Sequence, residues 1–147
     1  MKRPFFCNWN ITSVNRKAAI AELLELFPFR SNAQDLLLTA LETREQAEPT
    51  IVHKGIAMPH CRSILVDDFM IAIVKSKKGI PWPEEKVEVI ILFITPVKPS
   101  GPDEHMKLIR HLARLLRTDG AEKLLSADSP TEAASILHFT LQESKTE

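Results

Sequence analysis

The residues best suited to chemistry in this sequence are a histidine and an arginine two positions apart. Residues 55–62 read Gly-Ile-Ala-Met-Pro-His-Cys-Arg, so His60 follows a short run of small and apolar residues and stands directly behind Pro59. Proline fixes its φ and stiffens the approach to the ring. In an extended segment Arg62 points to the same side as His60. A neutral imidazole, with an ordinary pKa of about 6.5, is an available nucleophile near neutral pH. The pattern therefore predicts that His60 attacks an anionic group such as a phosphoryl.

Two residues elsewhere fit the same chemistry. Arg44 lies near the end of an expected helix, and a guanidinium is a good planar partner for phosphate. His105 opens another expected helix, where free backbone N–H groups attract anions. Simpler roles exist for both, because an arginine at a helix end complements the helix dipole and a histidine at a helix start is often only solvated. Together with His60 they indicate a phosphohistidine relay, in which Arg44 and His105 stabilise the transferring group.

Other roles for His60 are less well supported. A lone histidine at a core edge is commonly just hydrogen-bonded to the backbone. A nucleophilic pair with the adjacent Cys61 fails, because neighbouring residues in a strand point to opposite faces. A zinc site would need paired short spacings, which the four candidate ligands lack: His53, His60, Cys61 and His105. We expect no metal and no cofactor.

The composition indicates one ordinary globular domain over residues 1–147. Lys plus Arg equals Asp plus Glu at 19 each, which gives no support for bulk binding to nucleic acid or to anionic membranes. The longest apolar run, Val87–Thr95, is too short to insert into a bilayer. The first residues do not resemble a secretory signal, and two cysteines, Cys7 and Cys61, make no disulfide framework. We expect a cytoplasmic protein.

The first part of the chain predicts two helices. Ser13 can cap a helix over roughly residues 14–26, which Pro28 ends. Ser31 or Asn32 can cap a second helix that runs to about residue 46. Its expected buried stripe consists of Leu36, Leu37, Ala40 and Leu41.

Three strands are predicted next, followed by three helices. Residues 55–61 read as a short buried strand, 69–75 as a second and 87–95 as a third that is central because it is apolar on both faces. Residues 79–83 form an expected turn. Helices are predicted over 103–117, 119–126 and 130–141, with Ser129 capping the last. This order indicates an α/β protein, close to the α+β class, with a sheet covered by helices.

Four segments resemble one known family. They are Thr43-Arg44-Glu45-Gln46, the Gly55-Ile56-Ala57-Met58-Pro59-His60 segment, Phe93-Ile94-Thr95-Pro96 and Glu104-His105-Met106-Lys107-Leu108. In this order they resemble the type 2 enzyme IIA domain of the bacterial phosphoenolpyruvate-dependent phosphotransferase system. This class includes fructose, mannitol and nitrogen-regulatory members. The resemblance covers about residues 11–140.

The resemblance implies a fold, an activity and partners. The family fold is a mixed sheet, here of about five strands, with helices on both faces. Its histidine, which matches His60, is phosphorylated by the histidine phosphocarrier protein (HPr) or its nitrogen-branch counterpart. It passes the phosphoryl group to a cysteine of enzyme IIB or uses it as a regulatory signal. The helper histidine of the family falls on His105 and its arginine on Arg44.

The sequence departs from the family before Gly55. Members commonly have Thr-Gly-x-Gly-x-Gly there, whereas this chain has Thr50-Ile51-Val52-His53-Lys54-Gly55. Ile51 and His53 resist conformations that glycine adopts, so we expect this loop to run differently. His53 and Lys54 then add donors near the site, and together with Arg62 they are candidate phosphate-binding residues.

Two functions follow from these patterns. One is a phosphocarrier, which is a phosphotransferase component that relays the group through His60. The other is a free-standing regulatory module whose binding to a partner protein depends on His60 phosphorylation. Three apolar residues are candidates for a docking face around His60, although ordinary core packing is the favoured explanation for them: Ile56, Met58 and Trp82.

Overall fold

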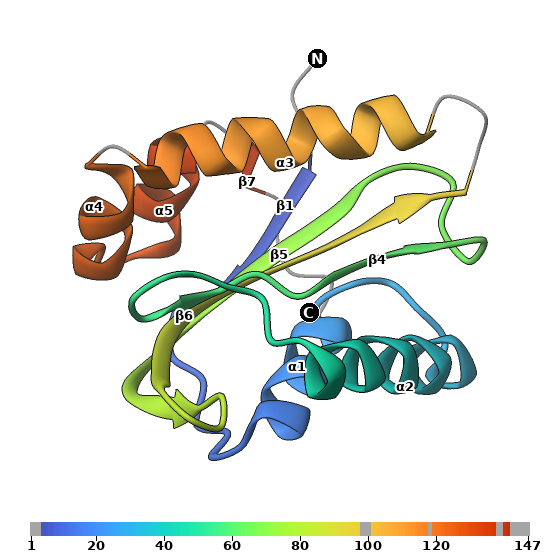
Figure 1. The fold of residues 1–147 in the computed structure, drawn as a ribbon, viewed down its shortest axis with the longest axis horizontal. Helices are drawn as coiled ribbons and strands as arrows, with labels where there is room; N and C mark the ends of the chain where they lie inside the picture. Colours follow the sequence, from blue (N-terminus) through green and yellow to red (C-terminus); the bar gives the residue numbers. More distant parts are fainter. Residues whose placement is uncertain (1–3, 98–100, 118, 138–139, 142–147) are drawn as a thin grey trace.

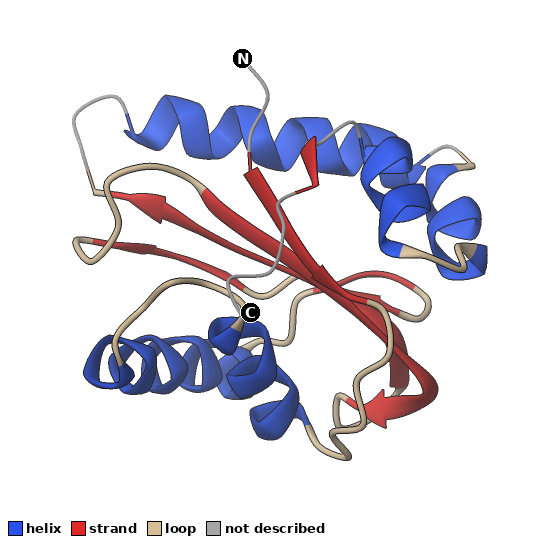
Figure 2. Cartoon of the chain, turned by 180° about the vertical axis from the view of Figure 1, so that it is seen from behind, coloured by secondary structure: helices blue, strands red, loops and turns tan. Residues whose placement is uncertain are grey.

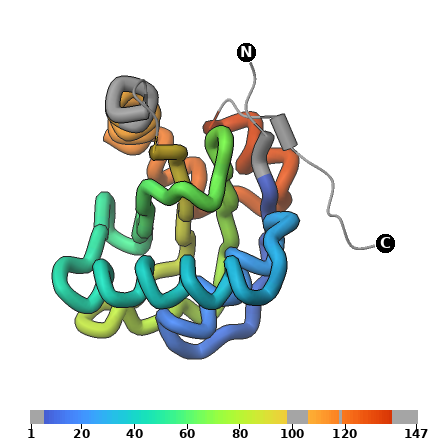
Figure 3. Tube along the Cα trace, turned by 90° about the vertical axis from the view of Figure 1, so that its right-hand side faces the viewer, coloured from blue at the N-terminus to red at the C-terminus, as the bar shows by residue number. Residues whose placement is uncertain are grey.

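A central β-sheet with helices on both faces makes up the fold (Figure 1). The structure is a computed structural model that describes residues 4–97, 101–117, 119–137 and 140–141. One face carries α1 (Arg16–Glu25) and α2 (Ser31–Ala47), and the other carries α3 (Gly101–Arg117), α4 (Gly120–Ser126) and α5 (Pro130–Leu137). Figure 2 shows the same three layers from behind, and the end-on tube in Figure 3 places α2 and α3 on opposite sides of the strands. The predicted α/β class is confirmed.

The sheet is mixed, as the resemblance implies, and it has a few more strands than the roughly five expected from that resemblance. The order is β2-β3-β6-β5-β1-β7, and β4 also pairs with β6. Strands β5 and β6 are antiparallel, whereas β3 and β4 both run parallel to β6, so the sheet is mixed. The bounds are β1 (Pro4–Asn8), β2 (Ile51–His53), β3 (Ile56–Ala57), β4 (His60–Ser63), β5 (Met70–Pro81), β6 (Lys86–Pro96) and β7 (Thr140–Leu141). No helix in the described part of the chain is both long and apolar enough to cross a bilayer.

Strand β6 is central, as its apolar sequence predicts, and it separates two cores. Its residues alternate between the two faces. Val89, Ile91 and Phe93 belong to a core beneath α3, which we call the α3-side core. Ile90, Leu92 and Ile94 belong to a core against α1 and α2, which we call the α2-side core. Because all six are almost fully buried, β6 fixes both layers to one scaffold.

Strand β5 continues beyond residue 75, where the sequence predicted it to end. The register shifts between Lys75 and Ile80, and pairing with β6 then resumes. Gly79 has a φ of 83°, which a glycine adopts without strain. The predicted turn over residues 79–83 is therefore wrong at its start. The chain reverses after β5 instead, where the Trp82 N–H donates to the Glu85 carbonyl at 2.9 Å.

Both predicted caps in the first part of the chain are wrong. Asn15, not Ser13, caps α1 by accepting a hydrogen bond from the Ala18 N–H at 2.8 Å. Ser13 instead donates to the Glu22 carboxylate. At the start of α2, Arg30 occupies the cap position and makes no side-chain cap bond.

The buried stripe of α2 is also shifted from the prediction. Leu37 and Leu41 are buried as expected, but Leu36 is 62% exposed and Ala40 is exposed. The third buried position is Glu45, which continues the i, i+4 spacing of the two leucines. A carboxylate therefore takes the place in the stripe nearest to the predicted site.

The last predicted helix is shorter than expected. Ser129 does cap α5, because its Oγ accepts a hydrogen bond from the Glu132 N–H at 3.2 Å. The helix ends at Leu137, however, and residues 140–141 pair with β1 as a parallel strand. The N-terminal strand supplies the partner edge for this pairing, which local sequence does not reveal.

Candidate active site around His60

His60 lies where the predicted strand 55–61 is interrupted. The segment forms two short strands, β3 and β4, which both pair with β6 and are separated by Met58 and Pro59. Proline has no N–H for a sheet bond, but its carbonyl still accepts from the Phe93 N–H at 3.3 Å. His60 is thus the first residue of β4, and its half-buried ring is held at a fixed point on the sheet edge.

The ring of His60 packs against the aromatic ring of Phe93. The imidazole stacks on Phe93, with ring centroids 4.8 Å apart and an interplanar angle of 9°. The two residues are also paired in the β4–β6 register. Phe93 belongs to the α3-side core, so the His60 ring lies on that face of the sheet.

The hydrogen bonds of the ring determine which nitrogen carries the hydrogen. His60 Nδ1 lies 2.9 Å from the Met58 carbonyl oxygen. A carbonyl only accepts, so Nδ1 carries the hydrogen and donates it. In the neutral ring the lone pair is then on Nε2. That nitrogen lies 3.5 Å from Arg44 Nη2. The geometry thus places the lone pair of the neutral ring on the nitrogen that faces Arg44.

The surroundings of His60 keep the ring neutral. Burial lowers the pKa of His60 below its ordinary value of 6.5. The hydrogen bond to Met58 and the carboxylate of Glu45 raise the pKa of the ring, and the Arg44 charge lowers it, but the net direction is downward. A neutral, nucleophilic ring is therefore the dominant form at pH 7.

Arg44 is brought to His60 from the other face of the sheet. It lies in the last turn of α2, its side chain is exposed, and one of its terminal nitrogens reaches Nε2. An exposed guanidinium in this position can contact an anion that approaches Nε2. The structure therefore brings the predicted site residue Arg44 into contact with His60.

Arg62 shares the strand of His60. It pairs with Thr95 in β6, two positions along from His60 and Phe93, and it is exposed. The alternation of β4 places it on the same side as His60. Cys61, between them, packs against the α2-side core, and burial raises the pKa of its thiol to about 11. The thiol therefore faces away from the imidazole, as the strand geometry predicts.

His105 is only partly covered by the structure. The residue belongs to α3, but its side chain lies outside the described part of the chain. The helix buries Leu108, Leu112 and Leu116 in the α3-side core, which is also the core that contains Phe93. The helix that carries position 105 thus covers the same face of the sheet as the His60 ring.

His53 and Lys54 lie in a hairpin rather than in an open loop. Strand β2 pairs with β3, and the two are joined by Lys54 and Gly55, whose φ of 88° requires the glycine that this sequence retains. His53 Nδ1 donates to the Lys54 carbonyl at 3.0 Å, and its Nε2 lies 3.7 Å from Glu122 of α4. The ring of His53 is directed toward α4, so the structure does not bring it to Nε2 of His60.

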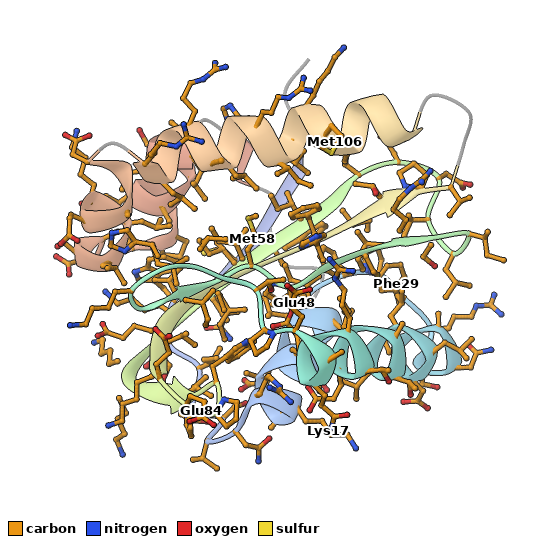
Figure 4. The ribbon with its side chains drawn as sticks, viewed as in Figure 1. Lys17, Phe29, Glu48, Met58, Glu84 and Met106 are labelled. Atoms are coloured by element: carbon orange, nitrogen blue, oxygen red, sulfur yellow. The ribbon has the colours of Figure 1, made fainter. Side chains whose placement is uncertain are left out.

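The three apolar residues considered for a docking face belong to the core, as the favoured explanation has it. Ile56, Met58 and Trp82 are 0%, 5% and 1% exposed, which supports the simpler explanation of ordinary packing. Figure 4 shows Met58 in the layer between the sheet and α3. The exposed apolar residues near β4 are different ones. They line a groove of about 210 Å³ between α2 and β4: Leu36, Ile64 and Leu65.

Sequence reasoning missed one charged residue close to the site. Glu45 is completely buried and contributes to the electrostatics of His60. The signal was its spacing, because Glu45 follows Leu37 and Leu41 at successive intervals of four. A carboxylate that continues an apolar stripe has to be buried with hydrogen-bond donors.

Comparison with known families places this geometry in context. Residues 6–139 match the family described as "Phosphoenolpyruvate-dependent sugar phosphotransferase system, EIIA 2". The match covers nearly the whole chain. The chain belongs to the EIIA 2 family. This confirms the resemblance inferred from the four sequence segments.

Curated relatives of this EIIA 2 chain are longer proteins. The chain is 27% identical over 127 residues to a multiphosphoryl transfer protein of Salmonella typhimurium, which covers 84% of this chain and 33% of that protein. It is 26% identical over 111 residues to the 2-O-alpha-mannosyl-D-glycerate-specific EIIABC component of the Escherichia coli K12 PTS, covering 72% of this chain and 17% of that protein. The chain thus spans about a third or less of the length of these two relatives.

Solved structures share the fold of this EIIA 2 chain. The nitrogen regulatory protein IIA-Ntr from Neisseria meningitidis has a TM-score of 0.76 at 21% identity, over 90% of this chain and 92% of that one. The complex of enzyme IIAMTL and phosphorylated enzyme IIBMTL from Escherichia coli contains a chain with a TM-score of 0.65 at 18% identity, over 90% and 93% of the two chains. At these identities the likeness shows the common fold.

Proposed function

We propose that this EIIA 2 domain is a phosphocarrier that accepts a phosphoryl group on Nε2 of His60. The donor is a phosphohistidine of HPr or of its nitrogen-branch counterpart, and the recipient is a cysteine of a IIB component. The observation that carries the proposal is the pair of contacts on one ring. Nδ1 donates to the Met58 carbonyl, which leaves the Nε2 lone pair 3.5 Å from the Arg44 guanidinium.

The transfer is an in-line displacement at phosphorus. The Nε2 lone pair of His60 forms a new N–P bond while the N–P bond of the donor breaks, and the electron pair of that bond returns to the donor imidazole. The transferring group carries negative charge on its oxygens throughout. A guanidinium that already lies at the attacking nitrogen stabilises this charge without rearranging.

Two further residues have proposed roles in this step. Arg62, exposed on the same side of β4 as His60, adds positive charge for the phosphoryl oxygens or for the partner surface. His105 acts as a hydrogen-bond donor to the phosphoryl group from the start of α3, which covers this face of the sheet. We propose no role in this step for His53 or Lys54, because the ring of His53 is directed toward α4.

Phosphoryl acceptance can be tested by reconstitution. The protein is incubated with phosphoenolpyruvate, enzyme I and each candidate carrier, and acid-labile, base-stable phosphate is mapped to a residue. The wild type is expected to be labelled on His60, and His60→Ala to take up none. His53→Ala is the matched control, because it also removes one imidazole, and it should be labelled normally. Labelling of His60→Ala would show that the assignment is wrong.

The recipient distinguishes a relay from a regulator. The exposed groove of Leu36, Ile64 and Leu65 lies beside the strand that carries His60, so a protein can dock on this surface in either case. Addition of IIB proteins to the labelled domain is expected to move the label to a IIB cysteine. A label that stays on His60 with every IIB protein would favour the regulatory module. In that case wild type and His60→Asp should differ in their affinity for a captured partner.

A further inference from the structure

The most unusual side chain near the site is the carboxylate of Glu45. It is 0% exposed, and burying a charge costs several kcal/mol unless hydrogen bonds compensate. Three donors surround it. Trp82 Nε1 and the Thr50 N–H donate to Oε1 at 2.8 and 3.1 Å, and the Thr50 hydroxyl donates to Oε2 at 2.6 Å. The buried carboxylate is therefore compensated by hydrogen bonds to both of its oxygens.

These bonds join three segments that are distant in sequence. Glu45 is in the last turn of α2, Thr50 immediately precedes β2, and Trp82 immediately follows β5. The Glu45 side chain is thus the common anchor of the strand that leads into the site, the end of the helix that carries Arg44, and the turn after β5.

The network continues from Glu45 to the reacting ring. The Thr50 carbonyl accepts from the Met58 N–H at 2.8 Å. The Met58 carbonyl in turn accepts from His60 Nδ1 at 2.9 Å. Thr50 and Met58 therefore connect the buried Glu45 carboxylate to Nδ1 of His60. A displacement of Thr50 moves the acceptor on which the orientation of the ring depends.

Glu45 and Arg44 also act on His60 with opposite charge. The two residues are adjacent at the end of α2. Arg44 lowers the pKa of His60, whereas Glu45 raises it. Among the described residues, Arg62 is a further charged group on this side of β4. Removing the Glu45 charge leaves the Arg44 guanidinium unopposed, so the ring becomes harder to protonate.

We propose that Glu45 is a positioning residue for His60. Through Thr50 and Met58 it holds the imidazole as the Nδ1–H tautomer with Nε2 toward Arg44, and its charge balances that of Arg44. The part of this proposal that concerns phosphoryl transfer rests on the proposed function, whereas the tautomer and the pKa of the ring are properties of the unphosphorylated protein. The two parts can therefore fail separately.

The first experiment removes the charge and keeps the shape. Long-range ¹H–¹⁵N NMR of the histidine rings is recorded against pH for the wild type, Glu45→Gln and Glu48→Gln. Glu48, labelled in Figure 4, is the exposed C-cap residue of the same helix and provides the same charge change. We expect the His60 pKa to fall in Glu45→Gln and to stay unchanged in Glu48→Gln. An unchanged or raised pKa in Glu45→Gln would overturn the charge-balancing role.

The second experiment perturbs the connection without touching Glu45. Thr50→Val keeps the shape of the side chain but removes the hydroxyl donor, and Thr50→Ser restores it. We expect Thr50→Val to populate both His60 tautomers and to lower the rate of phosphoryl acceptance roughly 10-fold, because small misplacements of a reacting group are costly. Thr50→Ser should recover both properties.

The outcomes distinguish failure of the Glu45 positioning role from failure of the proposed phosphocarrier function. If Thr50→Val keeps the single Nδ1–H tautomer and the wild-type rate, the positioning role is wrong, even where the wild type is labelled on His60. If the wild type is never labelled but the NMR changes occur as expected, Glu45 still positions the ring and the phosphocarrier function is wrong. Unfolding midpoints and amide spectra of each variant show whether it is folded.

Discussion

At the scale of single residues, the sequence singled out His60 as the proposed phosphoryl acceptor but did not indicate which of its nitrogens carries the lone pair. The Pro59–His60 segment is visible in the sequence, and so is a nearby arginine. The tautomer depends on the Met58 main-chain carbonyl, and any residue type supplies a carbonyl. Glu45 escaped notice for a related reason, because its donors Thr50 and Trp82 come together only in the folded chain.

Arg44 gives a prediction at this scale. Arg44→Gln removes the charge next to Nε2, so we expect the rate of phosphoryl acceptance to fall roughly 10²-fold, by loss of charge stabilisation in the transition state. The His60 pKa should rise at the same time, because Arg44 lowers it. Arg30→Gln, at the opposite end of α2, is the charge-matched control. Stopped-flow transfer and NMR titration measure the two effects, and an unchanged rate would remove Arg44 from the site.

The pH dependence of phosphoryl acceptance is a second prediction. The pKa of His60 is below 6.5, so Nε2 keeps its lone pair at neutral pH. We expect a constant rate above about pH 7 and a decline as the pH falls through the lowered pKa. The folded ring binds a proton less readily than the unfolded one, so the free energy of unfolding should also decrease as the pH falls below 6.5. A rate that increases on acidification would contradict the nucleophilic role.

At the scale of helices and strands, the long periodic helices were predictable and their faces less so. The helix over residues 31–47 was expected almost to its ends, but Leu36 was placed on the buried face and is exposed. Four apolar residues at 36, 37, 40 and 41 fit two adjacent stripes. Because the polar Glu45 continues one of these stripes, the sequence did not show which stripe faces the core.

A pair of adjacent leucines tests the observed face of α2. Leu37 is 2% exposed, so Leu37→Ala leaves a cavity and should lower the free energy of unfolding by about 2–5 kcal/mol. Leu36→Ala removes the same atoms at a position that is 62% exposed and should change it by no more than about 0.5 kcal/mol. Urea denaturation of both variants measures the difference. Equal losses would mean that α2 is rotated relative to the sheet.

At the scale of the whole molecule, the α/β class could be predicted because the apolar run in β6 and the amphipathic helices are local signals. The strands missed, β1, β2 and β7, are short, and two of them are stabilised by pairing between the two ends of the chain. The partners of Pro4–Asn8 are β5 and β7, which lie far along the chain from it. Such pairing depends on contacts of high sequence separation, which residue patterns do not reveal.

The shared sheet predicts that both cores unfold together. Trp9 lies in the α3-side core and Trp82 in the α2-side core, and β6 contributes side chains to both. In single-tryptophan variants, Trp9→Phe and Trp82→Phe, fluorescence should therefore report the same urea midpoint as far-ultraviolet circular dichroism of the same variant. A fluorescence midpoint that differs from the dichroism midpoint in either variant would show that the two layers are independent.

The most direct test of the central claim is ³¹P and ¹⁵N NMR of the phosphorylated protein. The claim is that the fold commits Nδ1 of His60 to the Met58 carbonyl and leaves Nε2 as the nucleophile. The account predicts one phosphohistidine, on His60, with phosphorus coupled to Nε2 and with Nδ1 still protonated. Phosphorus coupled to Nδ1, or to a different histidine, would contradict it.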